Sequence, residues 1–227
     1  MSKMAPEMLA LQRLYHWEKT SPNRVAFTQP MGGGVVQDTT WGEVANQVRR
    51  MANYLQSQGW EPGSKVAILS KNCSWWIMSD LAIWMAGYVS VPLYPTLAAA
   101  TVHQILTHSE AKACFIGKLD GWEQMKPGVP VGMPCLSYPL SPPDAIKSYP
   151  GWEKICKDTP PLQGNRERGG DELATLIYTS GTTGMPKGVM HSFSNFAWAL
   201  DAGIRRLPMG ADDRMLSYLP LAHVVER

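Results

Sequence analysis

Short apolar runs alternate with helix-like segments along most of this 227-residue chain, and this alternation constrains the fold more than any other feature. The run at 65–70 is apolar throughout its centre, as in a strand that is buried on both faces. A helix-like stretch at 74–86 and a second apolar run at 88–93 follow it. A helix that connects two parallel strands in this order forms a right-handed β–α–β crossover. We therefore predict an α/β fold with a mainly parallel sheet and helices on both faces.

Capping residues mark the starts of several predicted helices. Thr40 and Glu43 form a capping-box pattern before an apolar stripe of helical spacing, and Gly59 is suited to end that helix. Asn72 is predicted to cap the helix at 74–86, and Ser192 the helix at 193–207. The other predicted helices are 101–109, 119–126 and either 144–148 or 152–157, and the other predicted strands are 112–116, 131–136, 173–178, 188–191 and 215–219.

The segment 75–93 is apolar enough to resemble a membrane span, with Asp80 as its only charge. Gly87 and Pro92 interrupt it, so we interpret it as a buried helix followed by a strand and keep the membrane helix as the alternative. Residues 1–10 lack the apolar core of a signal peptide. We expect a cytoplasmic protein and leave peripheral membrane contact open.

Composition and charge exclude several classes of protein. The net charge is only +2 and no basic run is present, which argues against nucleic acid as a partner. The four cysteines form no C-x-x-C pair, so we expect free thiols in a reducing compartment and predict no metal site. Histidines at 103 and 108 are five residues apart and do not share a metal-binding helix face.

Three acidic residues, Glu18, Asp38 and Asp80, have no visible partner for acid–base catalysis. We therefore expect them to be solvated or to cap helices. We expect His191 only to cap or to fill space.

The run 176–188 combines an apolar strand with small residues, hydroxyls and one lysine. Glycines let backbone N–H groups approach phosphate oxygens, hydroxyls donate further hydrogen bonds, and Lys187 adds a positive charge. The run does not fit the P-loop pattern, because Pro186 replaces its second glycine. A hairpin loop with an exposed lysine is the alternative interpretation. The predicted nucleotide-binding residues are Thr179, Ser180, Gly181, Thr182, Thr183, Gly184 and Lys187.

Residues 179–188 resemble the glycine-rich signature of the adenylate-forming superfamily, which includes acyl-CoA synthetases, peptide-synthetase adenylation domains and luciferases. Residues 85–95 are similar to the family segment that ends in Pro-Leu-x-Pro, and residues 218–227 resemble the form found in long-chain fatty acyl-CoA synthetases. The resemblance extends from about residue 11 to residue 227. It implies the N-terminal portion of the family's large domain and ATP-dependent conversion of a fatty acid to acyl-adenylate and then acyl-CoA. ATP, Mg²⁺ and coenzyme A are the implied cofactors and co-substrates.

The resemblance also assigns roles to single residues. It implies a catalytic role for Lys187 on the phosphates, and it places His223 near the acyl carboxylate and the α-phosphate. The alternative for His223 is a partly buried histidine at a helix start. The resemblance further implies that the glycine-rich loop joins two strands, so that a helix dipole contributes little. Glu226 and Arg227 complete the long-chain signature, and we expect them to be structural.

The expected organisation has two parts, an N-terminal α/β subdomain at 1–162 and the start of a second subdomain at 163–227 that carries the loop. The resemblance implies that the rest of the large domain and a C-terminal domain are absent, and that this fragment alone is inactive. The alternatives are a non-catalytic nucleotide- or pyrophosphate-binding fragment and a ligase for another carboxylic acid. A scaffold with an accidental glycine loop is a third. Exposed strand edges also predict self-association.

Overall fold

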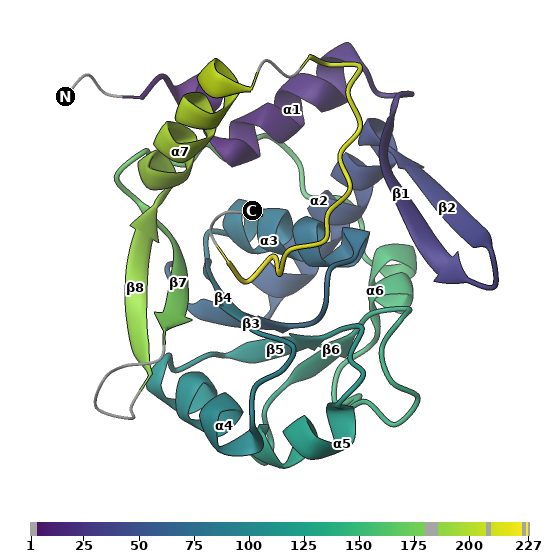
Figure 1. Ribbon diagram of the computed structural model, residues 1–227, viewed down its shortest axis with the longest axis vertical. Helices are drawn as coiled ribbons and strands as arrows, with labels where there is room; N and C mark the ends of the chain where they lie inside the picture. Colours follow the sequence, from purple (N-terminus) through teal and green to yellow (C-terminus); the bar gives the residue numbers. More distant parts are fainter. Residues whose placement is uncertain (1–3, 180–185, 208–209, 224–225, 227) are drawn as a thin grey trace.

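The computed structural model describes residues 4–179, 186–207, 210–223 and 226, and its centre is a six-stranded sheet with the order β6-β5-β3-β4-β7-β8 (Figure 1). The first five strands in that order are parallel, and β8 is antiparallel to β7. The strands are β3 (Lys65–Leu69), β4 (Val89–Leu93), β5 (Ala113–Ile116), β6 (Cys135–Ser137), β7 (Leu173–Thr179) and β8 (Lys187–Ser192). The predicted mainly parallel sheet is confirmed.

Helices cover both faces of this sheet (Figure 1). One apolar cluster joins the sheet to α1 (Ala10–Thr20), α2 (Trp41–Ser57), α3 (Ser74–Ala86), α6 (Trp152–Asp158) and α7 (Phe193–Arg206). A second cluster joins the opposite face to α4 (Ala99–His108) and α5 (Trp122–Met125). The central strands are buried from both sides for this reason, as their apolar composition predicts. The described residues also form two short 3₁₀ turns, Pro6–Met8 and Lys126–Gly128.

A separate two-stranded hairpin precedes the sheet. Strands β1 (Val25–Gly32) and β2 (Val35–Thr40) pair antiparallel and project from the molecule (Figure 1). The second strand ends at Thr40, whose side chain accepts a hydrogen bond from the Glu43 N–H while the Glu43 carboxylate accepts one from the Thr40 N–H. The predicted capping box is therefore confirmed. Gly59 follows α2 with φ of +70°, in the left-handed conformation expected after a helix end.

The cap of α3 differs from the prediction. Its N-cap residue is Cys73, and the Ser74 N–H donates to the Gln29 side chain of β1 at 2.8 Å. Asn72 is engaged elsewhere, since its amide bonds to residues 217–221. Gln29 is therefore the side chain that satisfies the start of α3, and the prediction for Asn72 is wrong.

Two predicted strands are also corrected. The segment predicted at 131–136 forms a strand only at Cys135–Ser137, because Val131 lies in a fully exposed turn. The segment 215–219 forms no strand, since its described residues have no strand beside them to pair with. Met215, Leu216 and Tyr218 are mostly exposed there.

The remaining helix predictions are partly confirmed. Of the two alternatives near residue 150, the helix is α6 at Trp152–Asp158. The segment predicted at 119–126 is shorter as a helix, at Trp122–Met125, and continues as a 3₁₀ turn.

The apolar segment at 75–93 divides into a buried helix and a strand, as predicted. The helix α3 ends at Gly87, which has φ of +94°, and β4 begins at Val89. In the described part of the chain, no helix has both the length and the apolarity needed to cross a membrane. All four cysteines are free, and Cys73, Cys114 and Cys135 are buried. Burial raises the pKa of the Cys135 thiol to about 12.

Candidate active site

The strands β7 and β8 fix the two ends of the glycine-rich run. Their antiparallel ladder runs from Leu173 opposite Ser192 to Thr179 opposite Lys187. Thr179 and Lys187 are therefore neighbours across the hairpin, and both are exposed. The predicted site residues Ser180, Gly181, Thr182, Thr183 and Gly184 lie outside the described residues. The expectation that the run joins two strands is confirmed.

Tyr178 supports the base of this hairpin. Its ring lies so close to Gly188 that a Cβ added at that glycine would be 3.1 Å from the Tyr178 Cζ. Its hydroxyl is 2.7 Å from the Nδ1 of His108 at the end of α4, and the two rings meet edge to face. Burial raises the pKa of Tyr178, so the phenol stays protonated near neutral pH. A side chain from the second helical layer thus holds the strand that leads to Thr179.

Side-chain hydrogen bonds join β7 to the rest of the sheet. Regular pairing between β4 and β7 is limited to Ser90 opposite Thr175. The Thr175 hydroxyl donates to the Ser90 carbonyl at 2.9 Å, and the Ser90 hydroxyl donates to the Ala174 carbonyl at 3.3 Å. The Trp84 indole N–H of α3 donates to the same Ala174 carbonyl at 2.8 Å. These buried bonds hold the hairpin against the central strands.

His223, the second predicted catalytic residue, is exposed and lies on a segment with buried neighbours. Leu221 and Ala222 just before it are 4% and 1% exposed, and Leu221 belongs to the larger apolar cluster. The His223 N–H donates to the Pro220 carbonyl at 2.8 Å, which closes a turn. Burial of the two preceding residues and this turn therefore fix the backbone at His223, while its side chain is exposed.

Asn72 attaches this segment to the sheet. It lies three residues beyond the end of β3, and its amide contacts Ser217, Leu219 and Leu221. Because β3, β4 and β7 are parallel, Asn72 and Thr179 both lie at the carboxyl edge of the sheet. The strand order puts β4 between the two strands that these residues follow or end. In open α/β sheets, this edge is where ligands bind.

The acidic residues do not all behave as predicted. The Glu18 carboxylate, expected to be solvated or to cap a helix, is partly exposed and accepts two hydrogen bonds from Arg49, at 3.1 and 2.7 Å. Asp80 is 3% exposed, so the solvated role is wrong for Asp80. Asp38 accepts a bond from Thr28 across the β1–β2 hairpin. Sequence spacing carries no signal for these partners, because each lies on another element.

Two other histidines that the sequence singled out lie on α4 and β8. His103 is exposed on α4, and His191 of β8 lies against the Phe196 ring. Within residues 4–179, 186–207, 210–223 and 226, no group of three or more His, Cys, Asp or Glu side chains is arranged to hold a metal ion. The prediction that this chain lacks a metal site remains a prediction.

Comparison with known proteins agrees with this geometry. The sequence pattern of the AMP-binding enzyme family matches residues 14–227. The chain belongs to this family. It is 33% identical over 220 residues to a long-chain-fatty-acid–CoA ligase of Mycobacterium bovis, an alignment that covers 94% of this chain and 36% of the relative. Long chain acyl-CoA synthetase 1 of Arabidopsis thaliana is 31% identical over 211 residues, covering 83% of this chain and 31% of that protein. The chain thus spans about a third of the length of these relatives.

Solved structures show the same fold. ATP-bound MatB from Rhodopseudomonas palustris matches with a TM-score of 0.77 and 22% identity, covering 98% of this chain and 42% of that one. A benzoate CoA ligase from Burkholderia xenovorans matches with a TM-score of 0.68 and 22% identity, over 85% of this chain and 36% of that one. The predicted fold class, that of the N-terminal portion of an adenylate-forming enzyme, is confirmed by this likeness.

Proposed function

We propose that this chain supplies the phosphate-binding part of an ATP-dependent fatty acyl-CoA ligase. The main observation that supports this proposal is the register of the β7–β8 hairpin. It holds Thr179 and Lys187 side by side at the carboxyl edge of the sheet. One hydroxyl and one ammonium group are therefore available at the two ends of a run of small, donor-rich residues. The relatives named above support a long-chain fatty acid as the substrate.

The proposed reaction has two steps. In the first, a carboxylate oxygen attacks the α-phosphorus of ATP, and the bond from that phosphorus to the bridging oxygen of pyrophosphate breaks. Negative charge accumulates on the leaving group, so Lys187 stabilises the transition state electrostatically. In the second, the sulfur of coenzyme A attacks the acyl carbonyl carbon, loses its proton and displaces AMP.

Different side chains bind the different reacting groups. Thr179 and the hydroxyl-bearing residues after it donate to the β- and γ-phosphates. His223 is accessible near the carboxyl edge, where a ring N–H donates to an oxygen of the carboxylate or of the α-phosphate. Magnesium supplies charge neutralisation on the phosphates when it is bound. Among the described residues, no cluster of side chains fits a metal ion.

A ligase for an aromatic or short carboxylic acid is the second candidate. The benzoate and anthranilate CoA ligases among the structural neighbours favour it. Acid-dependent exchange of labelled pyrophosphate into ATP, measured with palmitate and with benzoate, separates the two. The assay is run on this chain and on the longest reading frame that contains it. Exchange with benzoate alone would reject the fatty acid, and exchange with neither acid would leave the nucleotide-binding fragment as the function.

Lys187→Ala tests the phosphate site directly on this chain. We expect the affinity for ATP and for pyrophosphate, measured by calorimetry, to fall about tenfold, as the loss of one charge-assisted contact implies. Lys19→Ala, an exposed lysine in the last turn of α1, is the matched control and leaves both affinities unchanged. Equal affinities in Lys187→Ala and the wild type contradict the proposal.

A further inference from the structure

The side-chain amide of Asn72 makes three hydrogen bonds to one distant segment, two through its nitrogen and one through its oxygen. Its Nδ2 donates to the Ser217 hydroxyl at 2.8 Å and to the Leu219 carbonyl at 2.6 Å. Its Oδ1 accepts from the Leu221 N–H at 3.0 Å. Three bonds to one side chain across nearly 150 residues of sequence fix both the position and the direction of residues 217–221.

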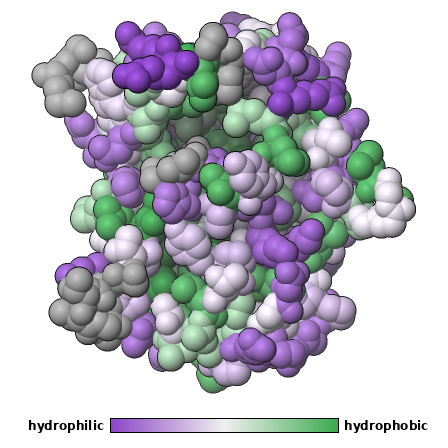
Figure 2. All heavy atoms as spheres, viewed as in Figure 1, coloured by the Kyte–Doolittle hydropathy of each residue, from purple (hydrophilic) through white to green (hydrophobic). Residues whose placement is uncertain are grey.

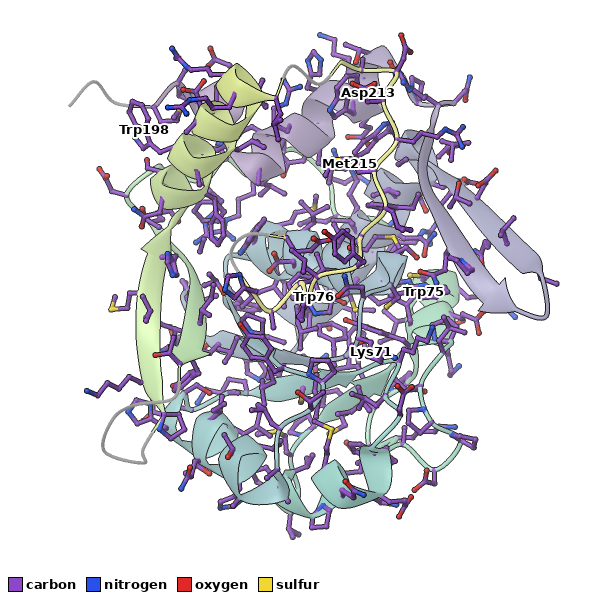
Figure 3. All side chains as sticks on the ribbon, in the orientation of Figure 1. Lys71, Trp75, Trp76, Trp198, Asp213 and Met215 are labelled. Carbon is purple, nitrogen blue, oxygen red and sulfur yellow. The ribbon has the colours of Figure 1, made fainter. Side chains whose placement is uncertain are left out.

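Arg24 holds the chain upstream of residues 217–221, through the Ala211 carbonyl and an ion pair of 3.1 Å with Asp212. Met215 and Leu216, between the two attachments, are 78% and 82% exposed. Figure 3 shows Asp213 and Met215 on the stretch that descends toward α3, with Lys71, the neighbour of Asn72, below it. The hydrogen bonds of Asn72 therefore determine where the chain enters the Pro220–His223 turn.

We propose that Asn72 is a positioning residue for the reaction: it seats the Pro220–His223 turn at the carboxyl edge of the sheet and so places the His223 ring. This inference rests on the proposed function, in which His223 meets the carboxylate or the α-phosphate. Asn72 itself need not touch the substrate. It acts through the backbone of Leu219 and Leu221, which the side chain binds.

The position of Asn72 at the carboxyl edge of the sheet is suited to this positioning role. Asn72 follows β3, a strand buried on both faces in the middle of the sheet, so its backbone is held rigidly. The apolar Leu221, 4% exposed, inserts into the same cluster as α3 and completes the attachment. A side chain is placed more accurately when its backbone is held by a residue of the sheet, here Asn72, and by a buried apolar neighbour, here Leu221, than when it lies on a free loop.

Amide exchange in this chain tests the attachment. In Asn72→Ala, we expect the exchange rate of the Leu221 amide to rise about tenfold or more, because its acceptor is lost. Asn72→Asp keeps an oxygen acceptor and loses both donors, so Leu221 stays protected while residues 217–219 loosen. The matched control is Asn53→Ala, which removes a single amide bond to the Pro160 carbonyl and leaves residues 217–223 unchanged. Wild-type protection in Asn72→Ala overturns the proposal.

The ring resonances of His223 test the positioning role. We expect ATP to shift these resonances in the wild type and in Asn53→Ala, and the shift to be lost in Asn72→Ala. ATP affinity should still depend on Lys187 in that variant. An equal His223 shift in wild type and Asn72→Ala overturns the positioning role alone. A wild-type His223 that does not respond to ATP overturns the role assigned to it in the proposed function, and Asn72 then loses its role as well.

Discussion

At the scale of single residues, Arg168 is the best example of a side chain whose position depends on several elements. Its guanidinium is almost fully buried and donates to the carbonyl oxygens of Trp84 and Tyr88, at 3.0 and 3.2 Å. Its Nε donates to Glu172 at 2.6 Å, and its charge lies 4.7 Å from the centre of the Phe193 ring. Burial lowers the pKa of Arg168. This residue joins the end of α3 to the strand β7 that leads to the candidate site.

Glu172 gives this cluster a pH dependence. Burial acts to raise its pKa, but hydrogen bonds from the Gly169 N–H and from Arg168 outweigh it, so the pKa is lowered. A carboxylate with a lowered folded-state pKa stabilises the protein above its unfolded pKa. That contribution is lost as the pH falls through the folded-state pKa.

Glu172→Gln should therefore reduce the free energy of unfolding by about 1 kcal/mol at pH 7, since the partly exposed carboxylate loses one charged hydrogen-bond pair. The difference between variant and wild type should shrink as the pH falls below the usual pKa of glutamate. Urea unfolding at pH 7 and at pH 3.5 measures both values. Glu153→Gln on α6 serves as the control, and a difference that grows toward acid pH contradicts the account.

At the scale of elements, the capping box of α2 shows how local sequence and packing act together. Thr40 is the last residue of β2 and also the N-cap of α2, so one residue ends the hairpin and starts the helix. The apolar side of the helix, from Val44 to Leu55, is buried in the larger apolar cluster, in which α3 is its main neighbour. A second capping box, Ser192 with Asn195, links β8 to α7 in the same way and confirms the predicted cap.

Thr40→Ala should reduce the free energy of unfolding by about 1 kcal/mol, because an N–H group at the helix start loses its acceptor. Thermal or urea unfolding monitored by circular dichroism provides the measurement. Thr107→Ala, an exposed threonine inside α4, removes a similar hydroxyl without a cap and is the control. A loss of equal size in both variants would show that capping is not the cause.

At the scale of the whole molecule, β8 forms an edge of the central sheet and carries exposed apolar side chains. Val189 and Met190 are 42% and 69% exposed. Figure 2 shows hydrophobic residues on the flank where Figure 1 places β8. An edge strand with apolar neighbours favours pairing with another copy of the chain, so the expected self-association remains a prediction at this edge.

Met190→Lys should weaken this self-association, because a charge on an edge strand opposes pairing between copies. Light scattering over a tenfold range of protein concentration should show a smaller increase in mean mass than for the wild type. Val131→Lys, at a fully exposed turn away from β8, is the matched control and should behave as the wild type does. A wild-type mass that stays monomeric over the whole range contradicts the prediction.

Also at this scale, the boundary between the two predicted parts, 1–162 and 163–227, remains a prediction. Strands β7 and β8 lie in the same sheet as β3 to β6. The linker side chains Arg166 and Arg168 bond to carbonyl oxygens at the end of α3. Both parts therefore share one hydrogen-bonded framework.

Much of this protein was determined by the sequence alone. The alternation of apolar runs and helical stretches predicted the parallel sheet, and the pattern at Thr40 and Glu43 predicted a cap. The family resemblance of the glycine-rich run implied that it joins two strands. Each of these depends on residues close together in the chain, where spacing and composition determine the local structure. The pairing of Thr179 with Lys187 was not among these predictions, because the expected strands, 173–178 and 188–191, left both residues in the loop.

Only the tertiary structure decided which side chains meet across the molecule. Gln29 caps α3 in place of Asn72, and Asn72 instead holds the segment before His223. The expected strand at 215–219 did not form, because a strand requires a hydrogen-bonding neighbour that local composition cannot specify. A polar side chain has several partners of similar energy within reach, and the packing of distant elements selects one of them.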